Sequence, residues 1–403
     1  MHSQQITWNP QAGWTPVKAE TEKVSLVFYF GTRQMLACGK RFSELREMFP
    51  AAHILGCSTG GQISNSDISD DEIVAAAISF DATRLQLVRQ DISDAQQSRN
   101  CGETIGRALQ REDLAGIFVL SDGLNVNGSE LVNGLVAAIG PNIPLTGGLA
   151  GDGADFTETL VGGDCAPRPR TVVGIGFYGS AIRIGHGSAG GWDLFGPRRQ
   201  VTKSTGNVLF ELDGQPALDL YERYLGPEDS KGLPGSALLF PIQVHDANHP
   251  DSAVVRTVLA VDHKARSMTF GGDVPQGWTA QLMHGNFDRL AEGAADAARQ
   301  ARESLDASEG QHQFSILISC IGRRLLMGQR TSDEAEAAGA ELGTDTVRLG
   351  FYSYGEISPH AKSGVCELHN QTMTVTSFAE VGHSRAPPGR QADRKSDRRR
   401  RRG

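Results

Sequence analysis

The stretch LAGIFVLSDGLNVNGSELVNGLVAAIG, residues 114–140, decides the fold class. It begins with the apolar run LAGIFVLSDG, which has the length of a buried strand and ends in a glycine turn. Apolar residues then recur at helical spacing over 129–140, and a second buried strand, TVVGIGFYG, follows at 171–179. A strand, a helix and a strand in this order predict a layered α/β domain.

The same alternation extends towards the N-terminus. We predict a helix at FSELREMF (42–49) and another at CGETIGRALQ (101–110), because their apolar residues are spaced for one helix face. Strands are predicted between and around them, at 23–30, 52–59, 72–80 and 83–90, and a further strand is predicted within 154–163.

The second half is predicted to be a mixed α+β domain. Near residues 181 to 225 the chain becomes rich in Gly, Arg and Asp, so we place a domain boundary near residue 225. Helices are expected at 216–225, 286–305 and from Ser332, and strands at 209–213, 237–244, 254–261, 266–274, 314–322, 348–357 and 371–378. The fold class is therefore α/β to α+β, with two layered mixed-sheet domains in tandem: an extension at 1–22, domains at 23–225 and 226–382, and a tail at 383–403.

Composition excludes several classes of protein. In the 403 residues no apolar run reaches the roughly 18 residues needed to cross a bilayer, and the N-terminus lacks the basic and apolar regions of a secretory signal. The six cysteines are scattered without a CxxC pair, which argues against a disulfide scaffold or a cysteine-rich zinc site. We expect a cytoplasmic protein with reduced thiols.

Charge is distributed unevenly along the chain. The segment after His383 contains nine of the 39 basic residues and two of the 47 acidic ones, so the remainder is strongly acidic. We therefore expect no specific binding of nucleic acid by the body. The tail is predicted to be disordered; it is either a solubilising or spurious extension or a segment attracted to an acidic partner, RNA or an anionic membrane.

Two glycine-rich stretches are candidate binding turns: GCSTGG at 56–61 and LTGGLAGDG at 145–153. In the second, Gly148, Gly151 and Gly153 are spaced GxxGxG, the reverse of the dinucleotide pattern, and no Gly-Lys-Ser/Thr follows. Two interpretations remain. The turns either connect buried strands tightly, or they line a cleft and expose backbone donors to a small polar or anionic ligand.

Histidine and cysteine patterns give weaker hypotheses. His245 and His249 have the spacing of a helical metal pair, but Asn, Pro and Asp around them favour a loop. His369, in CELHNQT, and His186, between two glycines, are candidate axial ligands for haem, with a hydrogen-bonded structural histidine as the alternative. Cys57, in GCSTGG, could act as a nucleophile only if a base lies nearby in the fold.

Ordered matches along the chain resemble the FIST family of signal-transduction sensors. The segments that carry the resemblance are GCSTGGQI, VLSDGLNVNGSELV, LTGGLAGDGADF, GIGFYG, HGSAGGWDLFGP, ELDGQPALDLYERYLG, MTFGGDVP, NFDRL, SCIGRRLLMGQR, FYSYGEISP and CELHNQTMTVTSF. They span roughly residues 23 to 380. At His284, in QLMHGNFDRL, the family would be expected to carry Lys or Arg.

The resemblance implies a fold of two FIST halves and a ligand cleft shaped by the two glycine turns. Asp152 is then a polar contact. We expect ligand contacts from Cys57, Ser58, Thr59, Gly147, Gly148, Gly151, Asp152, Tyr354, Glu356 and Asn370.

The resemblance also implies a sensor that signals through a separate partner, such as a histidine kinase or a cyclic-di-GMP enzyme. Some family members of this kind bind haem b and sense nitric oxide, and here His186 and His369 would be the iron ligands. The alternatives are an amino-acid-like ligand without haem, a cysteine-dependent enzyme using Cys57, and a scaffold that binds only protein. We expect a binding protein and not an enzyme.

Overall fold

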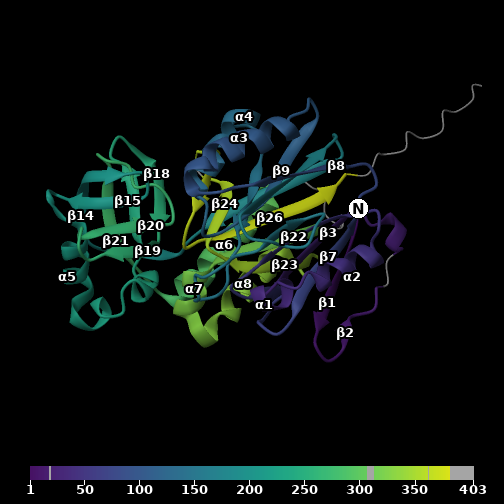
Figure 1. The fold of residues 1–403 in the computed structure, drawn as a ribbon, viewed down its shortest axis with the longest axis horizontal. Helices are drawn as coiled ribbons and strands as arrows, with labels where there is room; N and C mark the ends of the chain where they lie inside the picture. The colour runs from purple at the N-terminus through teal and green to yellow at the C-terminus, as the bar shows by residue number, and fades with distance from the viewer. Residues whose placement is uncertain (18–19, 306–312, 362, 382–403) are drawn as a thin grey trace, which may run out of the picture.

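A computed structural model describes residues 1–17, 20–305, 313–361 and 363–381. The fold is mixed α/β with several mixed sheets, as the sequence predicts. Figure 1 shows a large body, which contains both ends of the described chain, and a smaller lobe at the left formed by residues of the middle of the chain. The predicted basic tail at 383–403 lies outside the described residues.

Three six-stranded sheets make up the body. The first has the order β11 (Val161–Gly163), β4 (His53–Ser58), β3 (Leu26–Gly31), β7 (Ile73–Ser79), β1 (His2–Asn9) and β2 (Gly13–Trp14). The second has the order β25 (Cys366–His369), β24 (Gly355–Pro359), β10 (Leu145–Leu149), β9 (Leu114–Ser121), β12 (Thr171–Tyr178) and β8 (Arg84–Asp91). The third has the order β13 (Ile182–Ala189), β26 (Met373–Glu380), β22 (Gln313–Cys320), β23 (Val347–Ser353), β5 (Gln62–Ser64) and β6 (Asp67–Ser69).

The lobe is built on a separate sheet. Its order is β18 (His249–Arg256), β17 (Ile242–Asp246), β21 (Thr279–Gly285), β14 (Trp192–Thr205), β15 (Val208–Leu212), β20 (Ser267–Phe270) and β19 (Val258–Asp262), with β16 (Gln215–Pro216) beside β15. The helix α5 (Ala217–Ser230) packs against it. Trp192 and Gly285, where the chain enters and leaves the lobe, are partners in the β14–β21 pairing.

Helices cover the sheets of the body. The pair α3 (Ser98–Leu109) and α4 (Gly128–Ile139) packs together, as does the pair α6 (Phe287–Ser304) and α8 (Ser332–Leu342). A side chain at Gly102 would meet the Leu131 carbonyl oxygen at 2.2 Å, so glycine permits the close approach of α3 and α4. The shorter helices are α1 (Arg33–Leu36), α2 (Lys40–Met48), α7 (Ile321–Met327), and the 3₁₀ turns η1 (Thr21–Lys23), η2 (Ala95–Gln97), η3 (Gly235–Leu239) and η4 (Gly328–Arg330).

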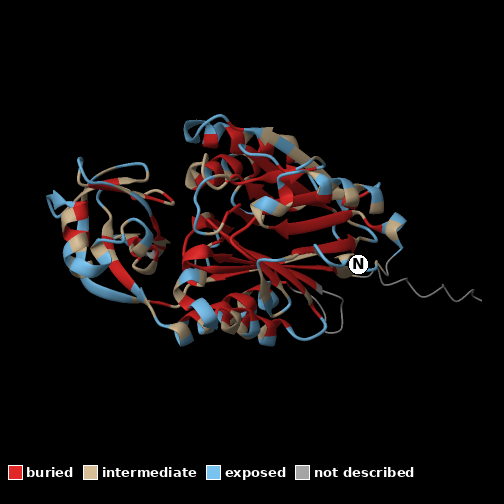
Figure 2. Cartoon of the chain, turned by 60° about the horizontal axis from the view of Figure 1, so that its bottom comes forward, coloured by how far each residue is buried: buried red, intermediate tan, exposed pale blue. Residues whose placement is uncertain are grey.

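The three body sheets share one aromatic core. Phe28 lies 5.1 Å from Phe118 and 6.2 Å from Phe314, measured between ring centroids, so one phenylalanine joins strands of all three sheets. Phe30 and Phe351 are 4.5 Å apart. Figure 2 shows the strands of the body as the main buried region.

The order of strands bears on the predicted domains. Residue 225 lies inside α5 of the lobe, and two of the three body sheets combine strands from before and after it. Residues 2–9, within the predicted extension, form β1 and pair with β7. The division of the sequence into 23–225 and 226–382 stays a prediction.

The strand predicted within 154–163 is present but short. It covers only Val161–Gly163, because Asp152 accepts hydrogen bonds from the backbone of Thr157 and Glu158 and holds the preceding residues in a loop. The prediction of a loop at His245 and His249 was wrong. His245 and His249 lie on a β-hairpin and not in a loop, since β17 and β18 continue up to a tight turn at Ala247 and Asn248, where the Asn248 amide donates to the Asp246 carboxylate.

Candidate ligand-binding site

The two glycine turns meet at one edge of the body. β3 and β4 are parallel neighbours, and both end beside the turn that follows β10. The Gly151 amide donates to the Ser58 carbonyl oxygen at 2.9 Å, and the Gly60 amide donates to the Tyr352 carbonyl oxygen at 2.8 Å. Stretches far apart in the sequence therefore form one surface.

A polar cleft of about 270 Å³ opens at this junction. Its walls come from the end of β3 and the start of α1, from both glycine turns, from the turn after β6 and from α7. The lining includes Thr32, Arg33, Thr59, Asp70, Asp152 and Arg324. Of the residues predicted to bind ligand, Thr59 and Asp152 line this cleft.

The two arginines of the cleft differ in their hydrogen-bond partners. Arg324 holds Asp70 in a two-pronged ion pair, with N–O distances of 2.8 and 2.7 Å, and also donates to the Gly60 carbonyl oxygen. The Nε atom of Arg33 is buried and has no hydrogen-bond partner among the described residues. Two carboxylates face its guanidinium group, Asp152 and Asp155, each at an N–O distance of 3.9 Å and so beyond hydrogen-bond distance. Arg33 therefore has capacity to bind an anion.

Asp152 organises the far wall of the cleft. One oxygen accepts the Tyr354 hydroxyl, and the other accepts the backbone amides of Thr157 and Glu158, both at 2.9 Å. The Phe156 ring stacks on Tyr354 with centroids 4.5 Å apart. These contacts fix the loop after β10 against β24, so the carboxylate of Asp152 shapes the cleft and also balances the charge of Arg33.

Other predicted ligand contacts lie inside the strands. Cys57 is fully buried in the shared core, and burial raises the pKa of its thiol well above the ordinary value. The Ser58 hydroxyl accepts the Leu160 amide at 2.8 Å. A side chain at Gly147 would meet the Val119 carbonyl oxygen at 1.9 Å, and one at Gly148 would touch Ile318. The structure gives these four residues packing roles, and their contact with a ligand stays a prediction.

Tyr354 connects the cleft to a second cavity. This interlobe cavity, about 410 Å³ in volume, lies between the body and the lobe, and its walls include Tyr354 and Gly271. Behind Gly271 lies Asn370, which is 1% exposed and has no hydrogen-bond partner on either amide atom within the described part of the chain.

Glu356 is a buried residue of β24, close to Tyr354 in the chain. Its carboxyl group accepts the Ser353 hydroxyl at 2.6 Å and the Thr372 hydroxyl at 2.9 Å. Burial raises the pKa of Glu356 to about 8, although these hydrogen bonds act in the opposite direction.

The candidate haem ligands are arranged differently from the expectation. An axial histidine needs a free ring nitrogen facing a space for the macrocycle. The Nε2 atom of His369 is 3.0 Å from the Ser358 carbonyl oxygen, its ring stacks on His360, and burial lowers its pKa to about 4. His186 is half-buried on β13, and burial lowers its pKa too.

Neither histidine lines the polar cleft or the interlobe cavity. Haem binding stays a prediction, which an absorption spectrum of the protein supplied with haemin would test. Among the described residues, no group of three or more His, Cys, Asp or Glu side chains could hold a metal ion.

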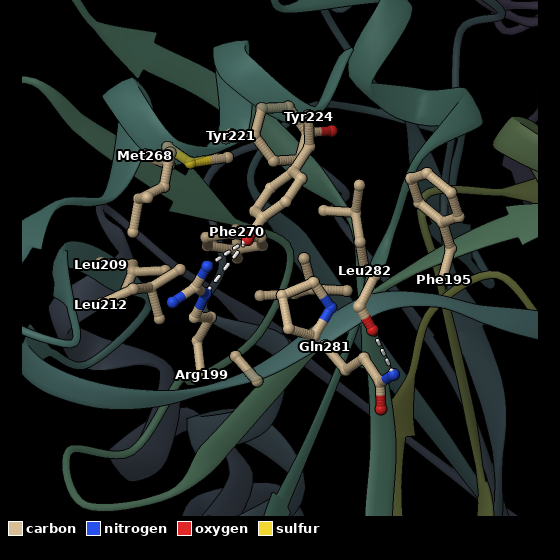
Figure 3. Close-up of a pocket in the computed structure, with 15 residues that line it drawn as sticks. Phe195, Arg199, Leu209, Leu212, Tyr221, Tyr224, Met268, Phe270, Gln281 and Leu282 are labelled. Carbon is tan, nitrogen blue, oxygen red and sulfur yellow. Dashed lines mark hydrogen bonds between the residues drawn. The ribbon is translucent and has the colours of Figure 1, made fainter.

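A third pocket lies in the lobe, beneath β14 and α5. Figure 3 shows its apolar lining, with Arg199 bonded to the Tyr224 hydroxyl at its rim and Gln281 bonded to the Gly196 carbonyl oxygen. The space inside is about 20 Å³, which is close to one water molecule. Side chains fill this pocket, and it leaves no room for a small-molecule ligand.

Sequence reasoning missed Arg33, Asp70 and Arg324. One signal was present, because the polar residues Thr32 and Arg33 directly follow a buried strand, and side chains after the carboxyl ends of parallel strands meet at one edge. The ion pair of Asp70 with Arg324 had no such signal. The two residues are 254 positions apart in the chain.

Two protein-family models match consecutive parts of the chain. The FIST N domain model matches residues 25–215 and the FIST C domain model matches residues 217–359. The chain belongs to the FIST family. FIST domains are sensory and signalling domains, which places this protein in that broad class. The boundary between the two models lies close to the start of α5.

Two further similarities were found. An uncharacterized protein of Methanocaldococcus jannaschii is 26% identical over 383 residues, which cover 85% of this chain and 71% of that protein. A crystal structure of a cyanuric acid hydrolase from A. caulinodans aligns over 94% of this chain and 98% of its own, with 9% identity and a TM-score of 0.36. In the described part of the FIST protein, no helix is both long enough and apolar enough to cross a membrane.

Proposed function

We propose that this FIST protein senses a small carboxylate-bearing molecule, which binds in the polar cleft through Arg33. The observation that carries the proposal is the buried, unpartnered Nε atom of Arg33 in a cleft formed by both glycine turns. Guanidinium and carboxylate form strong two-pronged hydrogen bonds. An anionic ligand would supply the partner that the folded protein leaves out.

The cleft also favours a ligand of amino-acid type. Its volume suits a molecule of few heavy atoms, and the Asp70 side chain is 56% exposed beside Arg324. A free amino group would share the exposed Asp70 carboxylate with Arg324, while the ligand carboxylate approaches Arg33. This charge pattern supports the amino-acid-like alternative over an uncharged ligand at this site.

The signal would pass to a separate protein. Asp152 lies next to Arg33 and is bonded to Tyr354, which reaches the interlobe cavity, so a change of charge at Arg33 acts on a residue that borders the lobe. A histidine kinase or a cyclic-di-GMP enzyme is the partner class that the family resemblance implies.

The test is calorimetric titration of the full chain with glycine, L-glutamate and succinate. Arg33→Gln should raise the Kd of the carboxylate that binds by about 10- to 100-fold, because a hydrogen bond to a charged group contributes roughly 1.5–3 kcal/mol. Arg33→Lys should keep part of the affinity, and Arg84→Gln, which changes an exposed arginine outside the cleft, should keep all of it.

Failure of all three compounds to bind, or binding that Arg33→Gln leaves unchanged, would overturn the proposal.

A further inference from the structure

The interlobe cavity is larger than the polar cleft and has a different chemistry. Body residues Leu124, Asn127 and Tyr354 form one side, and lobe residues Asn207, Leu259 and Phe270 form the other. At about 410 Å³ it falls within the range of small-molecule sites, which occur preferentially at interfaces between domains.

We infer that the interlobe cavity is a second ligand site of this protein, selective for a small uncharged molecule that carries amide-type hydrogen-bonding groups. The site is separate from the polar cleft, and it stands whether or not Arg33 binds a carboxylate.

The lining determines this class of ligand. Half of its hydrogen-bonding side chains are carboxamides, from Gln96, Asn127 and Asn207, while leucines, a valine and two aromatic rings supply apolar walls. Asn127 donates to Asp273 at 3.1 Å and accepts the Glu130 amide at 3.2 Å, and the Asn207 nitrogen donates to the Phe270 carbonyl oxygen at 2.8 Å. The Gln96 amide and the Asn207 oxygen therefore remain for a ligand. No lysine or arginine is among the lining residues, so an anion would lose its hydration without gaining a cation.

Glu130 is the charged residue of the lining, and its carboxylate already accepts the Asn133 amide at 3.1 Å and faces Arg99 at 3.5 Å. An ammonium ligand would therefore compete with partners that are in place.

Unpaired groups behind the cavity wall agree with a neutral ligand. A side chain at Gly271 would lie 3.0 Å from both amide atoms of Asn370, and the Gly271 amide donates to the Thr257 carbonyl oxygen. The Asn370 amide and the Thr257 hydroxyl are both buried without hydrogen-bond partners among the described residues. Buried polar groups are normally paired. These two unpaired groups behind the cavity wall are uncharged, and each can both donate and accept hydrogen bonds.

A ligand here would contact the body and the lobe at once. Leu259 and Phe270 belong to lobe strands, while Tyr354 precedes β24 of the body. Binding would thus hold the lobe in one position, which gives the site a direct effect on the arrangement of the protein.

The experiment uses three probes of nearly the same shape: benzamide, benzoate and benzylamine, which are neutral, anionic and cationic at pH 7. Ligand-observed NMR and calorimetric titration of the full chain should show benzamide binding at least about tenfold more tightly than benzylamine. Leu259→Trp, at a residue that is 38% exposed, should fill the cavity and abolish benzamide binding. Val365→Trp, at a residue that is 40% exposed and outside the lining, is the matched control and should bind benzamide normally.

A second blocking variant, Leu124→Trp, enters from the body side and should act like Leu259→Trp. The inference is overturned if no benzamide binding is detected, if benzylamine binds equally well, or if both blocking variants retain benzamide binding. Benzoate distinguishes the two sites. Benzoate binding that Arg33→Gln removes and Leu259→Trp preserves belongs to the polar cleft, and supports the separation of the two sites.

Discussion

At the scale of single residues, partners decide which side chains of the cleft can respond to a ligand. Arg33 and Arg324 border the same cleft, yet Arg324 is hydrogen-bonded to Asp70 and Gly60, while Arg33 has two carboxylates only at 3.9 Å, beyond hydrogen-bond distance. The two arginines thus differ in their capacity to bind a ligand, because the groups that pair with them lie far away in the sequence.

Glu356 should make stability depend on pH. Its pKa of about 8 exceeds its ordinary value, so from about pH 4.5 to 8 the folded protein retains a proton that the unfolded chain releases. Folding stability is then lost as pH rises through this window, by roughly up to 1.4 kcal/mol per pH unit. Glu356→Gln should remove this dependence, and urea unfolding of both proteins at pH 5, 6.5 and 8 measures it. Parallel stability curves for the two proteins would contradict the expectation.

Cys57 should be inert towards alkylation. A thiol must ionise and be reached by the reagent, and Cys57 is buried with a raised pKa, whereas Cys38 is exposed. Iodoacetamide at pH 7.5, followed by mass spectrometry of the native protein, should label Cys38 well before Cys57. Equal labelling rates would support the enzyme hypothesis that uses Cys57 as a nucleophile.

At the scale of elements, periodic segments were predictable and loops were not. The helices at 101–110 and 286–305 carry regular apolar faces and form as expected. The segment ALLFPIQV, predicted as one strand, divides into η3 and β17 at Pro241, whose ring nitrogen cannot donate to a sheet. The loop after β10 depends on Asp152 and Tyr354, which are 202 positions apart, so no local pattern reveals it.

Loss of the Tyr354 hydroxyl should loosen this loop. Tyr354→Phe removes a hydrogen bond to the buried Asp152 carboxylate and should cost about 1–3 kcal/mol of stability in urea unfolding. Tyr178→Phe is a useful comparison, because the Tyr178 hydroxyl donates to the neutral Leu109 carbonyl oxygen, and it should cost less. An equal or larger cost for Tyr178→Phe would show that the carboxylate does not strengthen the Tyr354 bond.

At the scale of the whole molecule, a single buried guanidinium holds the connections between body and lobe. Arg323, fully buried on α7, pairs with Glu334 at 2.8 Å and donates to the carbonyl oxygen of Gly190, just before the lobe, and to that of Leu290, just after it. Its neighbour Arg324 lines the polar cleft. The helix α7 therefore lines the polar cleft and also contacts both segments that connect the body to the lobe.

Arg323→Lys should weaken the hydrogen bonds that hold the two connections to the lobe, while it keeps a positive charge opposite Glu334. A lysine cannot donate in several fixed directions at once, so hydrogen exchange of backbone amides at 190–192 and 286–290 should accelerate by about tenfold or more. The adjacent Arg324→Lys should leave these amides nearly unchanged. Equal acceleration of hydrogen exchange in both variants would show that Arg323 does not specifically hold the segments at 190–192 and 286–290.

The pairing of Trp192 with Gly285 means that the lobe is a cassette, that is, a segment that could be removed or exchanged as a unit. Its two ends lie side by side on adjacent strands, so a turn of a few residues could bridge them in place of residues 193–284. The strand order of the body does not pass through the cassette. Insertions, deletions or exchange of the lobe can therefore accumulate in relatives while the three-sheet body and its polar cleft keep their geometry.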